Sequence, residues 1–220
     1  MNETWQLDRT LTSPRIGGEP PRLRLVPLTL EHAEAFLAAT SDRPDEVFAH
    51  LSYDPPRDLE QARAVIERLN APATQQPYAQ IVAETGEFAG TTSFYDIDPK
   101  LRALAIGHTW ISRPWWRSWL NTSSKLTLLT HAFEQLGAER MVWHTDIRNL
   151  RSRQAILRLG AQQEGVLRHH RIRRDGSWRD TVQFSMLADE WPAARDRLYE
   201  RLALGSAEAG TSGSGREGRS

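Results

Sequence analysis

The spacing of apolar residues predicts an alternation of strands and helices between residues 22 and 204. Apolar and polar residues alternate over residues 22–28, as in a half-buried strand, and residues 29–37 then carry apolar side chains at helical spacing. A second helical pattern begins after Asp58, which is placed to cap a helix, and ends at Asn70. The chain therefore opens as a strand followed by two helices.

Three extended segments come next, separated by short turns. They cover residues 78–84, 88–95 and 103–111, with turns at residues 85–87 and near Asp98-Pro99. Because short turns join neighbouring strands of opposite direction, these segments favour an antiparallel meander.

The second half of the chain returns to alternating helices and strands. The predicted elements are a helix over 122–136, a strand over 141–145, a helix over 150–159, a hairpin of strands 166–173 and 179–186 that turns at Asp175-Gly176, and a helix that begins near Pro192. Gly137 and Gly160 stand where the first two helices should end. The element order implies a mixed α/β (α+β) fold in which helices flank a mostly antiparallel central sheet.

The two ends of the chain lack such a pattern. Residues 1–21 mix charged residues with proline and glycine, which predicts an N-terminal arm. Residues 205–220 are rich in glycine and serine and hold too few apolar groups to offset the entropy of ordering, which predicts a disordered tail. One domain over residues 22–204 is expected, because 220 residues leave little room for two.

Composition narrows the function classes. The 28 Lys and Arg balance the 28 Asp and Glu, which argues against a protein that mainly coats nucleic acid or an anionic membrane. The chain has no cysteine, so disulfides, thiolate metal sites and cysteine nucleophiles are excluded. No apolar run is long enough to span a bilayer and the first residues do not resemble a secretion signal, so a cytoplasmic protein is expected.

Local motifs exclude further classes. The sequence contains no P-loop, dinucleotide-binding glycine fingerprint, HExxH, GxSxG or EF-hand pattern. His169 and His170 are adjacent on a predicted strand, where neighbouring side chains point to opposite faces. We therefore expect no metal site.

The stretch from Ile106 to Thr122 carries the clearest chemical signal. It runs as a strand, a tight loop and the start of a helix. Such a junction presents free backbone N–H groups and a positive dipole end, which suit an anion such as pyrophosphate. The alternative is structural, with tryptophans packed in the core and a polar residue as the helix cap: Trp115, Trp116 and Trp119, with Asn121 or Thr122.

Five short motifs in a fixed order carry a family resemblance. They are Ile106-Gly107-His108-Thr109-Trp110, Asn121-Thr122-Ser123-Ser124-Lys125, His131-Ala132-Phe133-Glu134, Asn149-Leu150-Arg151-Ser152 and the segment from Arg158 to Arg168. Through this ordered set the chain resembles the GCN5-related N-acetyltransferase (GNAT) superfamily, and within it the ribosomal-protein-alanine-acetyltransferase-like (RimJ/RimL-like) branch. The resemblance in element order covers residues 22–190.

The resemblance implies a GNAT-like fold and transfer of an acetyl group from acetyl-CoA to a primary amine, by direct attack in a ternary complex. A splayed strand is then expected to offer backbone groups to the pantetheine amides and to polarise the thioester carbonyl, at Thr109, Trp110 and Ile111. The pyrophosphate is expected on the loop and helix start, at Trp116, Arg117, Ser118, Trp119, Leu120, Asn121 and Thr122. Asn149 is expected to bind the pantetheine arm, and Ser152 to protonate or stabilise the departing thiolate.

The phosphate loop departs from the family pattern. The family loop reads Q/R-x-x-G-x-G/A, and its two glycine positions fall on Trp119 and Asn121. Glycine lets the backbone approach a phosphate closely, whereas an indole needs space. Either Trp119 points into the core and the N–H groups stay presented, or the cofactor site is altered. Arg117 is placed to contact phosphate directly.

The attacking ammonium must lose its proton to a base near the strand ends, directly or through water. The candidates are His108, Asp96, Glu84 and Tyr95. His108 has a suitable intrinsic pKa, although a strand histidine is equally explained as a packed residue. Asp96 has the alternative role of capping a turn, and Ser152 that of an ordinary hydroxyl at a helix start.

The acceptor is not fixed by the sequence. A protein N-terminus and a small-molecule amine both stay open, and the first 100 residues, which resemble the family least, are expected to shape that site. Between Arg151 and Asp180 eight arginines face three acidic residues, an excess that suits CoA phosphates, an acidic acceptor or a solvated hairpin face. Another donor such as succinyl-CoA would need an arginine in the acyl pocket.

Two non-catalytic functions are alternatives to an enzyme. The first is an acyl-CoA-binding or regulatory module on the same fold, and the second is a scaffold whose tryptophans form a subunit interface. Relatives are often homodimers, so the resemblance also implies a homodimer.

Overall fold

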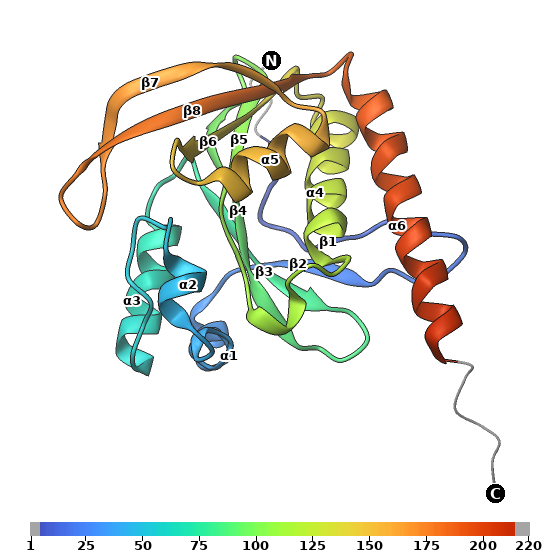
Figure 1. Cartoon of the computed structure of the whole chain (residues 1–220), viewed down its shortest axis with the longest axis horizontal. Helices are drawn as coiled ribbons and strands as arrows, with labels where there is room; N and C mark the ends of the chain where they lie inside the picture. Colours follow the sequence, from blue (N-terminus) through green and yellow to red (C-terminus); the bar gives the residue numbers. More distant parts are fainter. Residues whose placement is uncertain (1–4, 214–220) are drawn as a thin grey trace, which may run out of the picture.

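A computed structural model describes residues 5–213 and places them in an eight-stranded sheet with helices on both faces (Figure 1). The strand order is β1-β2-β3-β4-β5-β6-β8-β7. Strands β5 and β6 are parallel, and the other six neighbouring pairs of the described sheet are antiparallel. The mixed, mostly antiparallel architecture predicted from the apolar pattern is confirmed.

The strands are β1 (Leu11–Thr12), β2 (Leu23–Pro27), β3 (Gln76–Val82), β4 (Phe88–Asp98), β5 (Ala103–Ile111), β6 (Arg140–Asp146), β7 (Gln162–Ile172) and β8 (Trp178–Leu187). The α-helices are α1 (Ala33–Thr40), α2 (Pro44–Phe48), α3 (Leu59–Asn70), α4 (Leu120–Thr130), α5 (Leu150–Leu159) and α6 (Trp191–Gly213). Shorter helical turns are η1 (Leu30–His32), η2 (Arg113–Trp115) and the π-helical η3 (His131–Gln135).

Local signals account for most helix bounds. Helix α3 begins after Asp58, whose side chain accepts the N–H of Gln61 at 2.8 Å, and α5 has its predicted bounds, with Gly160 in the left-handed region at its end. Helix α2 was not predicted, because a five-residue helix is too short to show a periodic pattern. Strand β7 begins at Gln162 instead of residue 166, because it continues to pair with β8 there.

Two apolar clusters pack against the sheet. Helices α1, α2 and α3 cover one face with a cluster that includes Phe36, Phe48 and Trp110. Helices α4, α5 and α6 contribute to the second cluster, which includes Leu126 and Phe184 (Figure 1). The sheet is thus covered on both sides, and the site lies where its two halves separate.

The segment predicted as an N-terminal arm adds the edge strand β1 to the sheet. Leu7, Leu11 and Ile16 are buried in the larger cluster, and the Tyr78 hydroxyl donates to the Leu7 carbonyl at 2.5 Å. At the other end α6 continues to Gly213, past the predicted start of the tail at residue 205. Residues 214–220 of the predicted tail lie outside the described residues. Within residues 5–213 no helix is both long and apolar enough to cross a membrane.

Candidate active site

Strands β5 and β6 run side by side for only three residues each. Their pairing covers Ala103 to Ala105 on β5 and Arg140 to Val142 on β6, although both strands continue beyond it. After this point β5 stays paired with β4 and β6 stays paired with β8. The two halves of the sheet therefore diverge, and the edge of β5 from Ile106 onward lies open toward a cleft.

A bulge in β5 lies beside the point of divergence. Ser93 of β4 pairs with Gly107, whereas Thr91 pairs with Trp110, so β5 holds an extra residue here. His108 takes up the excess with a φ of 49°, a left-handed backbone that residues other than glycine adopt rarely. Gly107 is required next to it, because a Cβ there would lie 2.6 Å from the Tyr95 ring.

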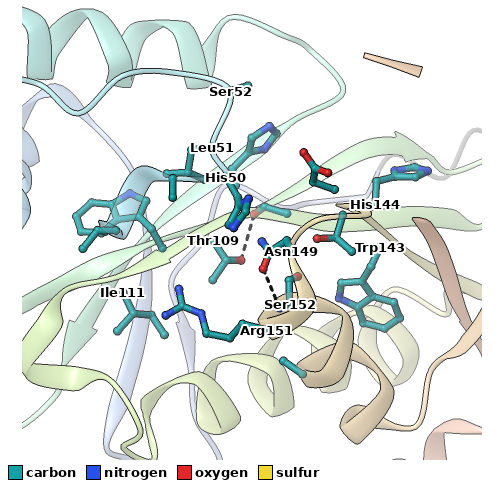
Figure 2. A pocket seen from close by; sticks show the side chains of 18 of the residues that line it. His50, Leu51, Ser52, Thr109, Ile111, Trp143, His144, Asn149, Arg151 and Ser152 are labelled. Atoms are coloured by element: carbon teal, nitrogen blue, oxygen red, sulfur yellow. Dashed lines mark hydrogen bonds between the residues drawn. The ribbon is translucent and has the colours of Figure 1, made fainter. Parts of the chain in front are cut away.

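The cleft is a cavity of about 2330 Å³ that extends from the α4 N-terminus to the β7–β8 hairpin. This exceeds the few hundred to about 1,000 Å³ typical of small-molecule sites, so two substrates have room in it. Figure 2 shows side chains from the α2–α3 loop, β5, β6 and α5 converging on it. His50, Thr109, His144 and Asn149 are among them.

The loop before α4 forms one end of the cavity. Ser118 donates through its hydroxyl to the Trp115 carbonyl at 2.8 Å and accepts the Leu120 N–H at 3.2 Å. The helix accordingly begins at Leu120, two residues before the predicted start, and the expectation that Asn121 or Thr122 caps it is wrong. Both residues instead lie in the first helical turn, where backbone N–H groups have no partner within the helix.

Trp119 lies on the core side of this loop. Its ring packs edge-on against Trp115, with centroids 5.6 Å apart, and the Arg22 guanidinium lies 4.5 Å from its centre. Neither Trp119 nor the fully buried Leu120 lines the cavity. Of the two outcomes that the sequence leaves open, the structure has the partly buried indole packed against the core and away from the cavity.

Trp116 and Arg117 do line the cavity. The Trp116 indole N–H donates to the Ile111 carbonyl at 2.6 Å, and the guanidinium groups of Arg113 and Arg151 lie over its ring, 4.8 and 4.5 Å from the ring centre. Arg117 is exposed, with a φ of 60°. An anion at this end of the cavity would be bound by backbone N–H groups and by arginine side chains, which are donors.

Lys125 is a buried cation without an acidic partner among the described residues. Its ammonium donates to the hydroxyls of Thr109 at 3.0 Å and Thr92 at 3.4 Å, and these two hydroxyls are 2.8 Å apart. Burial lowers the pKa of Lys125 to about 7. The residue lies on α4 and lines the cavity, and a substantial share of its amine is uncharged at neutral pH.

Asn149 and Ser152 form the N-terminus of α5, at the wall of the cleft opposite β5. The Asn149 side-chain oxygen accepts the Ser152 N–H at 3.0 Å, as Figure 2 shows. Asn149 is therefore the helix cap, and its side-chain NH₂ group is left to face the cavity that it lines. The Ser152 hydroxyl lies in the same wall.

The other end of the cavity holds a cluster of ionisable groups around Tyr95. The Tyr95 ring contacts those of His108 and His144, with centroids 5.2 and 6.1 Å apart. Burial raises the pKa of the Tyr95 phenol above its usual range, and the adjacent Asp96 raises it further. Tyr95 therefore keeps its proton at neutral pH, which removes it as a base and makes it a hydrogen-bond donor.

The remaining candidate bases differ in where they lie relative to the cavity. His108 lines the cavity, and burial lowers the pKa of its imidazole, although the Asp96 carboxylate opposes this. Asp96 is exposed at a second β4 bulge, while the turn role falls to Asp98, which accepts the N–H groups of Lys100 and Leu101. Glu84 is exposed in the β3–β4 turn and does not line the cavity.

A family model for the acetyltransferase (GNAT) domain matches residues 22–162 of the chain. The chain belongs to the GNAT acetyltransferase family. Its membership makes the protein an acyltransferase, as the ordered motifs predict.

Individual relatives agree with this assignment. The chain is 30% identical over 174 residues to the uncharacterized N-acetyltransferase YoaA of Bacillus subtilis, a match that covers 77% of this chain and 95% of that protein. A GCN5-related N-acetyltransferase from Brucella melitensis superposes with a TM-score of 0.79 at 27% identity, covering 88% of this chain and 89% of that one. Mycobacterium smegmatis RimJ in complex with CoA-disulfide has the same fold, with a TM-score of 0.73 at 20% identity over 88% of this chain and 95% of that one.

This GNAT chain also holds site residues that the sequence reasoning missed. Lys125, His50 and His144 line the cavity, although the sequence pattern assigns no chemical role to any of them. A lysine placed at a helix position three or four residues from buried ones was the available signal for Lys125. His144 gave none, because its role depends on a contact with Tyr95 across the sheet.

The two adjacent histidines of β7 face different surroundings. His169 stacks on Trp178 with ring centroids 5.0 Å apart, whereas His170 lines the cavity 6.0 Å from the His144 ring. Within the described part of this GNAT chain, no group of three or more His, Cys, Asp or Glu is arranged to hold a metal ion.

Proposed function

We propose that this GNAT enzyme transfers the acetyl group of acetyl-CoA to a primary amine, which attacks the thioester carbonyl directly in a ternary complex. A C–N bond forms as the C–S bond breaks. The ammonium gives its proton to a base, and the thiolate of CoA takes up a proton as it leaves. Family membership supplies acyl transfer, and the acetyl donor and amine acceptor are the proposal.

The observation that carries the proposal is the divergence of β5 from β6 directly before the α4 N-terminus. The open edge of β5 offers backbone donors and acceptors to an extended arm, and the first turn of α4 offers N–H groups to an anion. These two features suit pantetheine and pyrophosphate, which are joined in CoA. The Trp119 indole does not fill this space, since it packs against Trp115 and Arg22.

The pyrophosphate is assigned to the N–H groups of the first α4 turn, at Asn121 and Thr122, with Arg117 as a charged contact. The backbone from Thr109 to Ile111 and the Asn149 side-chain NH₂ are assigned to the pantetheine arm. The support is that all these residues line the one cavity.

His108 is assigned as the base, with Asp96 beside it to stabilise the imidazolium. A lowered pKa keeps the His108 imidazole neutral and able to accept a proton at pH 7. Ser152 is assigned to the leaving group, because its hydroxyl lies in the cavity wall near Asn149.

The experiment is an assay of thiol release from acetyl-CoA against a panel of amines, including peptides with free N-termini and small amines. The proposal expects release that depends on the amine and a product heavier by one acetyl group. Thiol release at the same rate with and without amine, or none with any amine, would overturn it. Succinyl-CoA in a parallel series tests the choice of donor.

A cytoplasmic homodimer is part of the same proposal, and its support is the family resemblance. Light scattering after size-exclusion chromatography decides the oligomeric state, with a mass near 25.0 kDa counting against the dimer. Weak retention on DNA and on anionic vesicles is expected from the zero formal net charge.

A further inference from the structure

Two arginines lie opposite each other on the hairpin that bounds the cavity. Arg171 of β7 and Arg179 of β8 are paired in the register of the two strands, so their side chains project from the same face. Both line the cavity. Like charges at directly opposed positions destabilise a sheet, which makes this pairing costly unless an anion lies between or above them.

Neither arginine has an acidic partner among residues 5–204. Arg179 is partly buried, and its Nε is a buried donor without a hydrogen-bond partner in the described chain. Burial lowers the pKa of Arg179, and the adjacent charges of Arg171 and Arg173 lower it further, while the carboxylate of Asp146 opposes this. The Arg179 guanidinium is therefore partly buried without a carboxylate hydrogen-bonded to it.

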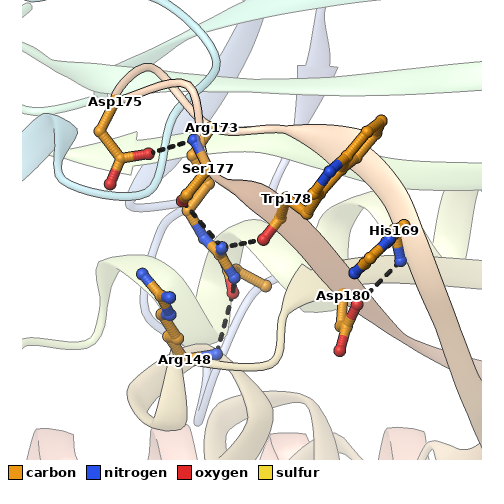
Figure 3. Close-up of polar contacts among 8 residues, drawn as sticks. Arg148, His169, Arg173, Asp175, Ser177, Trp178 and Asp180 are labelled. Atoms are coloured by element: carbon orange, nitrogen blue, oxygen red, sulfur yellow. Dashed lines mark hydrogen bonds and ion pairs between the residues drawn. The ribbon is translucent and has the colours of Figure 1, made fainter.

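Asp146 and the acidic residues of the hairpin itself are already engaged, whereas Asp96 lines the same end of the cavity beside Tyr95. Arg173 donates to both oxygens of the buried Asp146, at 2.6 and 2.8 Å, and the Arg148 N–H also binds this carboxylate. Figure 3 shows these contacts, together with Asp175 bound to the backbone of its own turn and Asp180 bound to the His169 N–H. The carboxylates of the hairpin therefore bind other groups, and Arg171 and Arg179 face the cavity without an ion pair to them.

An irregularity in the backbone of β7 turns Arg171 toward the cavity. Adjacent strand residues normally face opposite sides, yet His170 and Arg171 both line the cavity. The β7 register shifts between Leu167 and Arg171, and His169 has a left-handed φ of 50°. A bulge of this kind redirects side chains at the edge of a site.

The pair lies at the end of the cavity that holds the candidate base. Arg171 and Arg179 are both close enough to Tyr95 to act on its phenol electrostatically, and Tyr95 contacts His108. The hairpin tip is tied to the α2–α3 loop by an ion pair of 2.7 Å between Arg174 and Asp54. A substrate between these elements would place its amine near His108 and another part beneath the hairpin.

We propose that Arg171 and Arg179 form a carboxylate-binding subsite, so that a substrate of this enzyme carries a carboxylate near the reacting amine or acyl group. The inference rests on the proposed function for the identity of the reaction. A planar carboxylate matches the fork of N–H donors on a guanidinium, and two guanidinium groups on one face of the sheet can donate to both of its oxygens. The carboxylate belongs either to the acceptor or to a dicarboxylic acyl donor.

The test compares substrates that differ only by a carboxylate. Acetyl-CoA is assayed with Gly-Asp-amide against Gly-Asn-amide and with 4-aminobutyrate against its amide, and succinyl-CoA is assayed against acetyl-CoA with Gly-Asn-amide. In either the amine pairs or the donor pair, kcat/KM is expected to be about tenfold or more higher for the substrate with the carboxylate. A factor of this size is typical of a charged hydrogen bond. Preference in the amine pairs assigns the subsite to the acceptor, and preference in the last pair assigns it to the donor.

The variants R171Q and R179Q are expected to abolish that preference, while rates for the neutral partner change little. R168Q is the matched control, because Arg168 is an exposed arginine of the same strand that does not line the cavity. Circular dichroism verifies folding. If R179Q fails to fold, R171Q alone tests the subsite, because Arg171 is exposed.

Calorimetric binding of succinate against succinamide, without any CoA, separates this inference from the proposed function. Succinate binding that weakens in R171Q supports the subsite even if no amine is acetylated. Turnover without a carboxylate preference in any pair overturns the subsite and leaves the transferase intact. Equal affinity of the wild-type chain for succinate and for succinamide would also overturn the subsite.

Discussion

The Tyr95 hydroxyl lies 2.8 Å from Nδ1 of His144 and links the two sides of the cleft where β5 and β6 have separated. On its other side the His144 ring is 3.1 Å from the Gln183 side-chain oxygen, whose amide donates to Glu164 at 2.9 Å. The Gln183 oxygen therefore accepts from Nε2–H of His144, and Nδ1 accepts the Tyr95 proton. The ring is held in one tautomer and one orientation at the end of the cavity that holds His108.

The substitution Tyr95→Phe tests this hydrogen bond. The ring still fills the space left by Gly107, so the loss is confined to the hydroxyl, and unfolding free energy should fall by about 1 kcal/mol. Urea denaturation measures it. Gly107→Ala should cost more, since its Cβ would meet the Tyr95 ring at 2.6 Å. Equal stability of Tyr95→Phe and the wild-type chain would mean that the contact contributes nothing.

The variant His108→Gln should lower kcat/KM by about a hundredfold, because glutamine cannot accept the proton of the ammonium. In the wild-type enzyme activity should fall on the acid side only below pH 6.5, since burial lowers the His108 pKa from that value and the protonated ring is inactive. A pH series of kcat/KM measures this limb, which should vanish in the variant. His169→Gln, which alters a ring stacked on Trp178, is the control. An unchanged acid limb in His108→Gln assigns the base elsewhere.

Lys125 should make stability depend on pH. Its pKa is about 7 in the folded chain and near 10.5 when unfolded, so between these values the unfolded chain binds more protons and stability rises with pH. Lys125→Met should be more stable than wild type at pH 7, by up to a few kcal/mol, with the gap closing toward pH 10. Thermal unfolding across pH measures this. Lys100→Met alters the other, exposed lysine, and a matching change there would refute the burial argument.

Ser152→Ala should slow turnover about tenfold and leave acetyl-CoA affinity within twofold of wild type, since the hydroxyl is assigned to the leaving thiolate. The helix cap should persist, because the Asn149 side chain binds the Ser152 backbone N–H and not its hydroxyl. Steady-state assays and calorimetry separate the two effects. A variant unchanged in both would return Ser152 to the role of an ordinary helix-start residue.

Elements with strong periodic patterns were predictable from the sequence, and so was the family. The meander, α5 and the β7–β8 hairpin follow from local spacing and turn residues, which act over a few neighbouring positions. The start of α4 was misplaced because Ser118, outside the apolar pattern, accepts the Leu120 N–H. The edge strand β1 was missed because two residues show no period, and its pairing with β2 is a tertiary contact.

The site was predictable only in part for the same reason. Asn149 and Ser152 were found through a linear motif, whereas the partnership of Tyr95 with His144 joins residues 49 positions apart. Trp119 contacts Arg22, a residue far away in the sequence that no local pattern connects with it. Glu84 was a candidate base because it ends a predicted strand, and the turn between β3 and β4 carries it away from the cavity.

A calorimetric titration of acetyl-CoA into the wild-type chain, with Trp119→Ala and Arg117→Gln in parallel, tests the proposed coenzyme site. We expect one binding site per chain. The affinity should be nearly unchanged in Trp119→Ala, because that indole packs against Trp115, and about tenfold lower in Arg117→Gln. Absence of binding heat with the wild-type chain at any temperature, together with binding in Trp119→Ala, would contradict the proposed coenzyme site, since the indole would then be what closes the phosphate site.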